Sequence, residues 1–226
     1  MNHQNNPFAN PEFARHYAST TALAVPGHQD LLTLTSALLQ SHLPSAATIL
    51  VLGAGGGLEI NTMARLQAQW CFIGIDPSVP MLTQAARYND AYQSRLQLYQ
   101  GEIDSAPEQQ QDGACCLLTL HFLNAAKRLA TLRQLRRRLR RGAPLVTAHY
   151  SVAEHQRQQY FDYYSAYKVA QGADAAQVKR SVAAMLQQLS ILSPEQDEQQ
   201  LLEAGFSQPQ PFYQGLVFRG WLAFAD

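Results

Sequence analysis

The sequence predicts an α/β protein whose mostly parallel β-sheet is covered by helices on both faces. Two observations predict this class. Short apolar runs alternate with segments of helical spacing between residues 28 and 150, a pattern typical of parallel strands joined by crossover helices. A glycine-rich turn, "LGAGGGLE" at 52–59, lies between the first apolar run and the next helix, where such sheets often bind a ligand.

The predicted elements follow from apolar spacing and from residues that begin or end helices. Pro80 suits the first turn of the third helix, and Gly142 suits the end of the fourth. The predicted helices cover 28–43, 58–69, 78–92 and 124–142. The predicted strands cover 47–53, 70–76, 95–101, 113–120 and 143–150.

The alternation stops after Tyr150. Residues 151–192 are expected to form a helical insert with a break near Gly172. We therefore expect a single domain over residues 1–226, with an N-terminal helical cap over 1–45 and this insert over 151–192.

The C-terminal segment predicts one more helix and a hairpin. Ser193 suits an N-cap, Pro194 the first helical position, and Gln196 completes a capping box. Gly205 is expected to end this helix, and two strand-like runs then flank Gln214-Gly215.

Composition narrows the function classes. The formal net charge of zero gives no overall attraction to nucleic acid or membranes. The polar N-terminus lacks the apolar core of a signal peptide, and no apolar run approaches membrane-spanning length. Cys71, Cys115 and Cys116 fall in strand-like runs without metal-ligand spacing, so we expect reduced core cysteines in a cytoplasmic protein that binds no metal.

The glycine turn indicates a nucleotide-type ligand. It lets a ligand approach the backbone, and amides at the helix start can bind an anion. The dinucleotide fingerprint has a third small residue that permits close helix–strand packing. Gly53 and Gly55 match it, but Leu58 occupies the third position, which argues against NAD. Asp76, at the end of the second strand, suits a ribose diol.

Six segments occur in the order and spacing of one enzyme family. They are "ILVLGAGGG", "FIGIDPSVPML", "YQGEIDSAP", "DGACCLLTLHFL", "LRRGAPLVTAHY" and "LLEAGF". From about residue 25 onward the chain resembles the class I methyltransferases that use S-adenosylmethionine (SAM). The resemblance implies a Rossmann-like fold with a seven-stranded sheet and an antiparallel last strand. It also implies SAM, or its product S-adenosylhomocysteine (SAH), as the cofactor.

The resemblance assigns cofactor contacts to the ends of the strands. The glycine turn would face the methionine part of SAM, Asp76 the ribose, and Glu102 the adenine. Thr119 would lie near the sulfonium. The complete implied set is Gly53, Ala54, Gly55, Gly57, Asp76, Pro77, Met81, Glu102, Ile103, Thr119 and His121.

One branch of the family resembles this chain more closely. "VPGHQDLL" and Lys179-Arg180-Ser181 are similar to segments of the bacterial enzymes that make carboxy-SAM for tRNA wobble-uridine modification. In that branch, an arginine of the insert contacts the extra carboxylate of carboxy-SAM. His28, however, replaces the tyrosine of that branch, and Arg180 also suits a solvated helix face.

One position departs from the whole family. Two residues before Gly53 the family usually has an acid that helps to bind the methionine ammonium, but this chain has Val51. Glu59 is near, although a helix dipole explains an acid in a first helical turn more simply. A non-catalytic protein that binds SAM or SAH therefore remains an alternative.

Candidates for catalysis and acceptor binding come from strand ends and from the insert. Methyl transfer needs a general base only when the acceptor must lose a proton. His121, His149 and Tyr150 are weak catalytic candidates, since each also suits a structural role. Tyr160, Tyr163 and Tyr167 share one predicted helix face, which indicates either an acceptor wall or ordinary packing. The expected substrate-binding residues are Tyr17, His28, Tyr163, Tyr167 and Arg180.

The sequence therefore predicts a SAM-dependent methyltransferase with a small-molecule acceptor. Residues 127–141 hold eight of the 17 lysines and arginines, but this helix should place its arginines at the edge opposite the cofactor. A solvated face is favoured over a tRNA-binding patch, so nucleic acid is disfavoured without being excluded. The prediction includes no membrane partner, and it is compatible with a homodimer.

Overall fold

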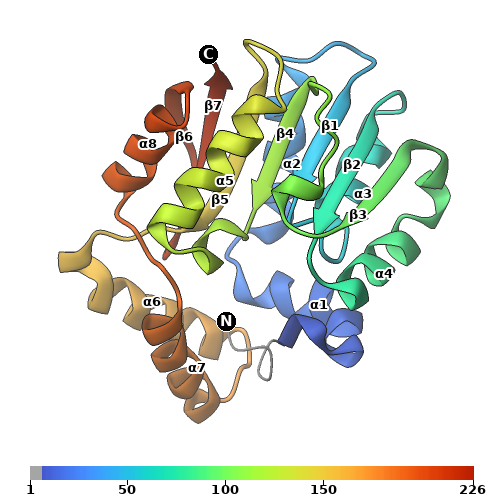
Figure 1. Ribbon diagram of the computed structural model, residues 1–226. Coiled ribbons are helices and arrows are strands. Elements are labelled where there is room, and N and C mark those ends of the chain that lie inside the picture. Colours follow the sequence, from blue (N-terminus) through green and yellow to red (C-terminus); the bar gives the residue numbers. More distant parts are fainter. Residues whose placement is uncertain (1–6) are drawn as a thin grey trace.

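The computed structural model describes residues 7–226, and its strands form one seven-stranded sheet of order β3-β2-β1-β4-β5-β7-β6 (Figure 1). β7 runs antiparallel to β5 and to β6, whereas the pairs from β3 to β5 are parallel. The strands are β1 Thr48–Leu52, β2 Cys71–Asp76, β3 Leu96–Gln100, β4 Gly113–Leu117, β5 Pro144–Tyr150, β6 Phe206–Gly215 and β7 Phe218–Ala225. The predicted fold class is confirmed, including the antiparallel strand that ends the chain.

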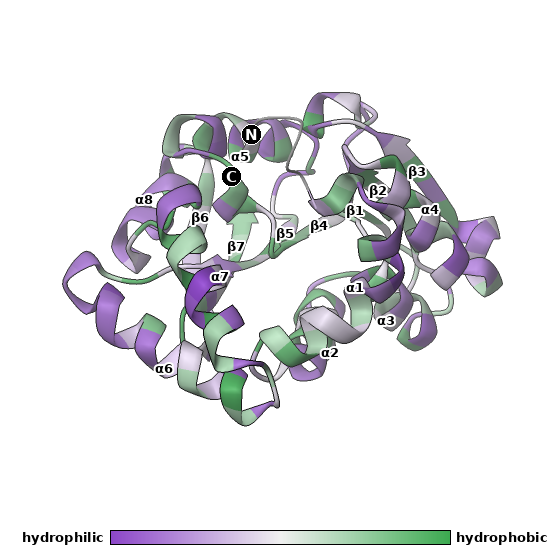
Figure 2. Cartoon of the chain, turned by 90° about the horizontal axis from the view of Figure 1, so that it is seen from below, coloured by the Kyte–Doolittle hydropathy of each residue, from purple (hydrophilic) through white to green (hydrophobic). Residues whose placement is uncertain are grey.

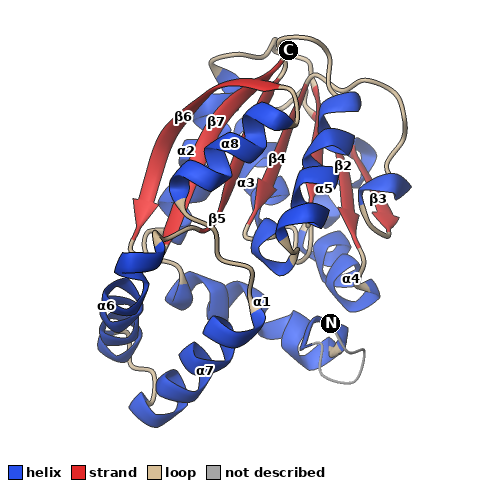
Figure 3. Ribbon diagram, turned by 60° about the vertical axis from the view of Figure 1, so that its left-hand side comes forward, coloured by secondary structure: helices blue, strands red, loops and turns tan. Residues whose placement is uncertain are grey.

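Helices cover both faces of the sheet, and two further groups of helices lie beyond one end of its strands (Figure 3). α2 and α3 pack on one face, and α5 and α8 pack on the other. α1, α6 and α7 lie beyond the carboxyl ends of the parallel strands (Figures 1 and 2). The helices are α1 Pro11–Ala24, α2 His28–Gln40, α3 Leu58–Leu66, α4 Val79–Tyr88, α5 Ala125–Arg137, α6 Arg157–Ala170, α7 Ala175–Gln188 and α8 Pro194–Glu203.

The central strands are apolar throughout because both of their faces are buried. In β1, Ile49 and Val51 belong to the core cluster beneath α2 and α3, while Leu50 and Leu52 belong to the cluster beneath α5 and α8. Each of these four side chains is at most 5% exposed. β1 ends at Leu52, in register with β2 and β4, so the glycine turn begins at the carboxyl end of the parallel strands.

The predicted signals at the ends of α8 are confirmed. The Ser193 side chain accepts a hydrogen bond from the Gln196 amide, and the Gln196 side chain accepts one from the Ser193 amide. Gly205 has a φ of 92°, the left-handed conformation that ends many helices. The insert also breaks as predicted, since Gly172 has a φ of 92° between α6 and α7.

Several predicted elements end earlier than expected: α2 ends at Gln40, α3 at Leu66, α4 at Tyr88 and β4 at Leu117. α5 ends at Arg137 instead of residue 142, because Gln111 exchanges backbone hydrogen bonds with Arg138 and Arg140. The hairpin turn lies at 216–217, two residues after the predicted place, and Gly215 still pairs with Phe218. A Cβ on Gly215 would lie 2.4 Å from the Tyr213 hydroxyl oxygen, so this glycine permits a close approach and does not form the turn.

Three burial expectations need correction. Cys71 begins β2 and is exposed, whereas Cys115 and Cys116 are buried core residues as expected. The basic run is not simply a solvated face, because Arg128 and Arg138 are buried. On α6, Phe161 and Tyr164 are buried, Tyr160 and Tyr167 pack partly buried against the same core, and only Tyr163 of the predicted stripe is exposed.

The N-terminal cap predicted over residues 1–45 consists of two helices with different positions. α2 packs on the sheet, while α1 lies over the carboxyl edge (Figure 1). Residues 1–6 lie outside the described part of the chain. Within residues 7–226, no helix has the length and hydropathy needed to cross a membrane.

Candidate functional site

The glycine turn joins β1 to α3 in a conformation that only glycine adopts easily. Gly53, Gly56 and Gly57 have φ angles of 78°, 82° and 70°. Side chains with a Cβ are disfavoured in this left-handed region, which explains three of the four glycines. The turn therefore has one defined backbone shape, and Gly57 begins α3 as its N-cap.

Side chains from distant segments lie directly against this turn. A Cβ on Gly53 would lie 1.9 Å from Oγ1 of Thr119, which follows β4. A Cβ on Gly56 would lie 2.7 Å from the ring of Tyr17, which belongs to α1. The glycines thus allow α1 and the end of β4 to meet at the end of β1.

The other two glycines contact the β2–α4 region. A Cβ on Gly55 would lie 2.7 Å from Oδ2 of Asp76 and 3.0 Å from Cε of Met81. A Cβ on Gly57 would lie 2.4 Å from the Asn89 side-chain nitrogen, which donates to the Gly57 carbonyl. These contacts place Asp76 and Met81 beside the turn.

The amides of the glycine turn form hydrogen bonds within the turn and to β2 and α4. The amides of Gly53 and Ala54 donate to the Ile75 carbonyl at 2.8 and 3.0 Å, and the Gly56 amide donates to the Met81 carbonyl at 3.3 Å. The Gly57 amide donates to the Ala54 carbonyl, and the Gly55 amide donates to the Asp76 carboxylate. Amides 53–57 therefore stabilise the turn itself, and the expected anion contact would fall to amides in the first turn of α3, which begins at Leu58.

Asp76 ends β2 and is partly buried. Its Oδ1 accepts a hydrogen bond from the Ser78 amide at 2.8 Å, and its carboxylate also accepts the Gly55 amide. Burial raises the pKa of Asp76, and the two amide hydrogen bonds act in the opposite direction. A carboxylate has about four acceptor sites, so Asp76 retains capacity for further donors.

Beneath the turn lies a small cavity of about 10 Å³, enough for about one water molecule. Glu59, in the first turn of α3, is among the residues that line it, together with Tyr17, His28, Leu31, Leu32, Gly53, Leu58, Leu117 and Leu118. Glu59 is only 7% exposed, and burial raises its pKa to about 7. Burial also lowers the pKa of His28, which leaves that imidazole neutral at pH 7.

An aromatic cluster lies beyond the ends of β4 and β5. The rings of His121 and Tyr150 are 4.6 Å apart, and Tyr150 also contacts Phe218 at 4.4 Å and Tyr164 at 6.3 Å. Within the described residues, the buried Nδ1 of His121 has no hydrogen-bond partner. Burial, followed by the nearby His149 and Arg128, lowers the pKa of His121 well below its ordinary value. His121 is thus a neutral imidazole with an unused nitrogen.

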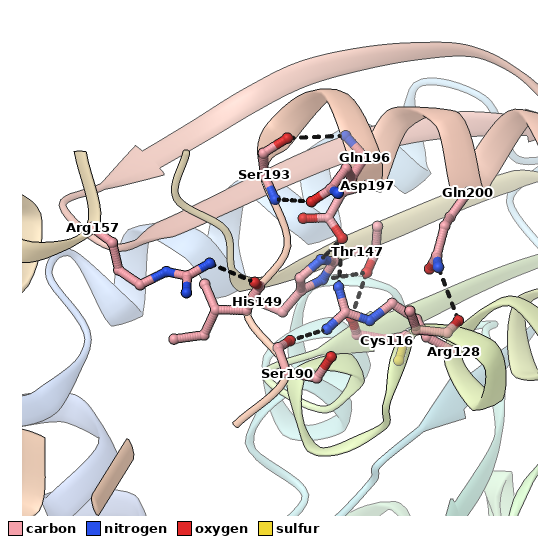
Figure 4. Close-up of polar contacts among 12 residues, drawn as sticks. Cys116, Arg128, Thr147, His149, Arg157, Ser190, Ser193, Gln196, Asp197 and Gln200 are labelled. Atoms are coloured by element: carbon pink, nitrogen blue, oxygen red, sulfur yellow. Dashed lines mark hydrogen bonds and ion pairs between the residues drawn. The ribbon is translucent and has the colours of Figure 1, made fainter. Parts of the chain in front are cut away.

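His149 lies in a separate, buried cluster on the α8 side of the sheet (Figure 4). Its Nε2 is 3.1 Å from Oδ1 of Asp197, which also forms an ion pair with Arg128. Arg128 donates in addition to the Ser190 carbonyl, and the His149 ring lies 5.5 Å from the Trp221 ring. These contacts tie α5, α8 and β5 together, and the structure does not bring His149 to the glycine turn.

The remaining predicted residues divide into two groups. Ile103 is buried after β3, whereas Glu102 is exposed there and forms an ion pair with Lys127 at 3.2 Å. Pro77 is exposed beside Asp76. Tyr167 packs partly buried against the core beneath α2 and α3. Tyr163 and Arg180 are exposed on α6 and α7, and neither lines the cavity at the turn.

Sequence reasoning missed two features of the site. Leu118 lines the cavity with a φ of 54°, a conformation that is unfavourable for a leucine and often found at functional sites. Only its position between β4 and Thr119 could have signalled this role. The second feature is the burial of Glu59, which the sequence explains only as an acid that complements the helix dipole; this burial depends on Tyr17 and His28 from distant segments and leaves no signal near Glu59 in the sequence.

Comparisons with known proteins agree with this geometry. Residues 49–142 match the family model of a methyltransferase domain. The carboxy-S-adenosyl-L-methionine synthase of Desulfotalea psychrophila is 24% identical over 207 residues, which cover 88% of this chain and 84% of that protein.

Two solved structures share the fold. An O-methyltransferase family 2 protein from Planctomyces limnophilus has a TM-score of 0.67 at 14% identity; the match covers 100% of this chain but 63% of that protein's length. The magnesium protoporphyrin IX methyltransferase of Synechocystis, solved with bound SAM, has a TM-score of 0.61 at 15% identity and covers 88% of this chain and 80% of that one. The predicted resemblance is confirmed: residues 49–142 are similar to a methyltransferase domain, and the chain has the fold of class I SAM-dependent methyltransferases.

Proposed function

We propose that the protein binds SAM at the glycine turn and transfers its methyl group to a small-molecule acceptor. One observation carries this proposal. The glycine turn, Asp76 and the buried Glu59 converge at the carboxyl edge of the sheet, in a chain with the methyltransferase fold. Open α/β sheets bind their ligands at this edge.

The residues at the turn fit the chemical groups of SAM. Asp76 retains acceptor capacity for the two hydroxyl hydrogens of a ribose. Met81 offers an apolar surface next to it, and Ile103 offers another after β3. Thr119 lies against Gly53, where the methionine chain and the sulfonium would pass. Gly53, Ala54, Gly55, Gly57, Pro77, Glu102 and His121 complete the proposed cofactor site.

The arrangement of α1 requires that the site open before it binds SAM. The cavity of about 10 Å³ is too small for the amino acid part of SAM, and the Tyr17 ring lies over Gly56. α1 makes its main contacts with α2, α4 and the short helix Pro7–Ala9. We therefore propose that α1 moves outward with Tyr17 on binding and that Tyr17 and His28 then border the ligand.

Methyl transfer from SAM needs few catalytic groups from the protein. The SAM sulfonium is already activated, so the protein mainly positions the acceptor in line with the methyl group. The neutral His121, with its unused Nδ1, is able to accept a hydrogen bond from an acidic O–H or N–H of the acceptor. Tyr150 is hydrogen-bonded to Tyr164 at 3.4 Å and positions the His121 ring, and His149 has a structural role.

Calorimetric titration with SAM, SAH and NAD tests the proposal. We expect micromolar dissociation constants for SAM or SAH and no measurable binding of NAD, because Leu58 occupies the position of the third small residue. Mass spectrometry of any ligand that is retained through purification gives an independent result. Preferential binding of NAD, or no binding of SAM and SAH, would contradict the proposal.

A second candidate function is carboxy-SAM synthesis, favoured by the relatives that align with 88% of this chain. Arg180 is exposed on α7, so in this chain it does not reach the turn; a partner subunit would have to supply it. This function predicts tighter binding of carboxy-SAM than of SAM, with a difference of about 10- to 100-fold that Arg180→Ala removes. Equal affinities in the unmodified protein would exclude it.

We further propose that the protein works in the cytoplasm, as a single domain over residues 1–226. Its three cysteines are free, which suits a reducing compartment.

The remaining alternative is a non-catalytic binding protein. A protein that binds SAM or SAH without catalysis would bind both ligands but transfer no methyl group. Screening small-molecule acceptors with radiolabelled SAM distinguishes this alternative from the proposed enzyme.

A further inference from the structure

We infer that Glu59 binds the α-ammonium of the amino acid part of the cofactor, the role that an acid at position 51 has in the family. This inference rests on the proposed function, and it names the residue that compensates for Val51. Val51 is fully buried, pairs with Gly74 and Cys115 in the sheet, and offers no charge. A cationic ligand group therefore needs another acid near the turn.

The first argument is the position of Glu59. It lines the same cavity as Gly53, the first residue of the turn, and as Leu117, the last residue of β4. The ends of β1 and β4 are where a ligand bound over the turn would place its amino acid part. Glu59 reaches this place from the first turn of α3, which follows the glycine turn, whereas Val51 belongs to β1, which precedes it.

The second argument is that Glu59 is a buried acid without a cation. Its side chain is 7% exposed, and its carboxylate accepts a hydrogen bond from its own amide. Within residues 7–226, no ion pair neutralises it, and the charged neighbour that affects it is the acidic Asp76. A buried charge that remains unpaired costs several kcal/mol in general, so proteins rarely keep one without a use.

A helix dipole does not explain this arrangement. An acid that only complements the dipole can remain in water, as Glu195 does in the first turn of α8. Glu59 instead is buried and lines the small cavity at the turn, together with Tyr17 and the neutral His28. An α-ammonium ion would supply the missing charge and up to three hydrogen-bond donors.

The test compares Glu59→Gln with the unmodified protein, using SAH and 5′-methylthioadenosine as ligands. Methylthioadenosine keeps the ribose and the adenine but lacks the amino acid part. We expect Glu59→Gln to weaken SAH binding about 10- to 100-fold, the usual effect of losing a buried charge-assisted hydrogen bond. Binding of methylthioadenosine should change less than twofold. Glu195→Gln is the matched control and should alter neither affinity.

A stability measurement separates this role from a structural one. Without ligand, Glu59→Gln removes a buried acid that nothing neutralises, so its urea midpoint at pH 8 should equal or exceed that of the unmodified protein. A structural Glu59 would give a lower midpoint and equal losses for both ligands. Unchanged SAH affinity in Glu59→Gln would overturn this inference and leave the proposed function intact. Absence of SAH binding in the unmodified protein would overturn both.

Discussion

Glu59 and Asp197 are both buried carboxylates near the first turn of a helix, yet their surroundings are opposite. Asp197 is 2% exposed and is paired with Arg128 and His149 (Figure 4). Burial alone would raise the pKa of Asp197, but His149 and Arg128 outweigh it and lower that pKa. Glu59 has no such partners, and burial raises its pKa to about 7.

This difference in partners distinguishes Asp197, whose charge is structural, from Glu59, whose charge we infer to bind a ligand. The Asp197 cluster joins α5, α8 and β5, so its charges are balanced within the folded chain. Glu59 lies at the carboxyl edge of the sheet, beside a turn whose glycines admit other groups. The balanced carboxylate should matter for folding, whereas the unbalanced one should matter for binding.

The largest expected effect is on folding. Asp197→Ala would leave Arg128, which is fully buried, without its carboxylate, and should lower the free energy of unfolding by about 3–5 kcal/mol. Urea denaturation followed by circular dichroism measures this change. The control is Glu195→Ala on the same helix turn, which loses only an exposed dipole interaction and a hydrogen bond from Ser193 and should change the free energy by less than about 1 kcal/mol. A loss below about 1 kcal/mol for Asp197→Ala would contradict the structural assignment.

Asp76 lies between Asp197 and Glu59 in how far its charge is balanced, because two backbone amides donate to its carboxylate but no cation pairs with it in residues 7–226. Asp76→Asn keeps the size of the side chain but loses the charge that would accept the ribose hydroxyls. We expect affinity for both SAH and methylthioadenosine to fall about 10- to 100-fold. This pattern differs from that of Glu59→Gln, which should affect SAH alone. Loss of SAH binding with unchanged methylthioadenosine binding would remove Asp76 from the ribose site.

Local patterns in the sequence were enough to predict most of the fold. The apolar run 47–53 and the glycines after it mark β1 and its turn because both signals lie within a few residues of each other. The capping box at Ser193 is equally local. Asp76 was placed beside the turn correctly because parallel strands in register bring their carboxyl ends to one edge.

Long-range contacts account for what the sequence did not predict. Arg128 belongs to a basic run that looks solvated, and its burial depends on Asp197, which is 69 residues away. The burial of Glu59 likewise depends on α1 and α2, whose packing across the turn leaves no local pattern. On α6, Tyr164 is buried and Tyr163 is exposed, although the spacing of the tyrosines favoured Tyr163. Spacing alone does not determine which of two adjacent residues faces the core.

The smallest expected effect is the pH dependence of cofactor binding. In the free protein the pKa of Glu59 is about 7, and an ammonium beside it would lower that pKa in the complex. Binding would therefore release a proton at pH 6 but not at pH 8. The groups around Glu59 on other elements are Tyr17, His28, Asp76, Cys115 and Cys116. Burial raises the pKa values of Tyr17 and both cysteines well above this range, and the pKa of His28 is lowered.

Because about one tenth of a group with this pKa is ionised at pH 6 and about nine tenths at pH 8, SAH affinity should rise about tenfold between these values. Burial also raises the pKa of Asp76, and its two amide hydrogen bonds act in the opposite direction. Calorimetry in two buffers of different ionisation enthalpy measures both the affinity and the protons released. Glu59→Gln should flatten the profile and release no proton. A tenfold rise that persists in Glu59→Gln would assign the titration to another group and remove the contrast with Asp197.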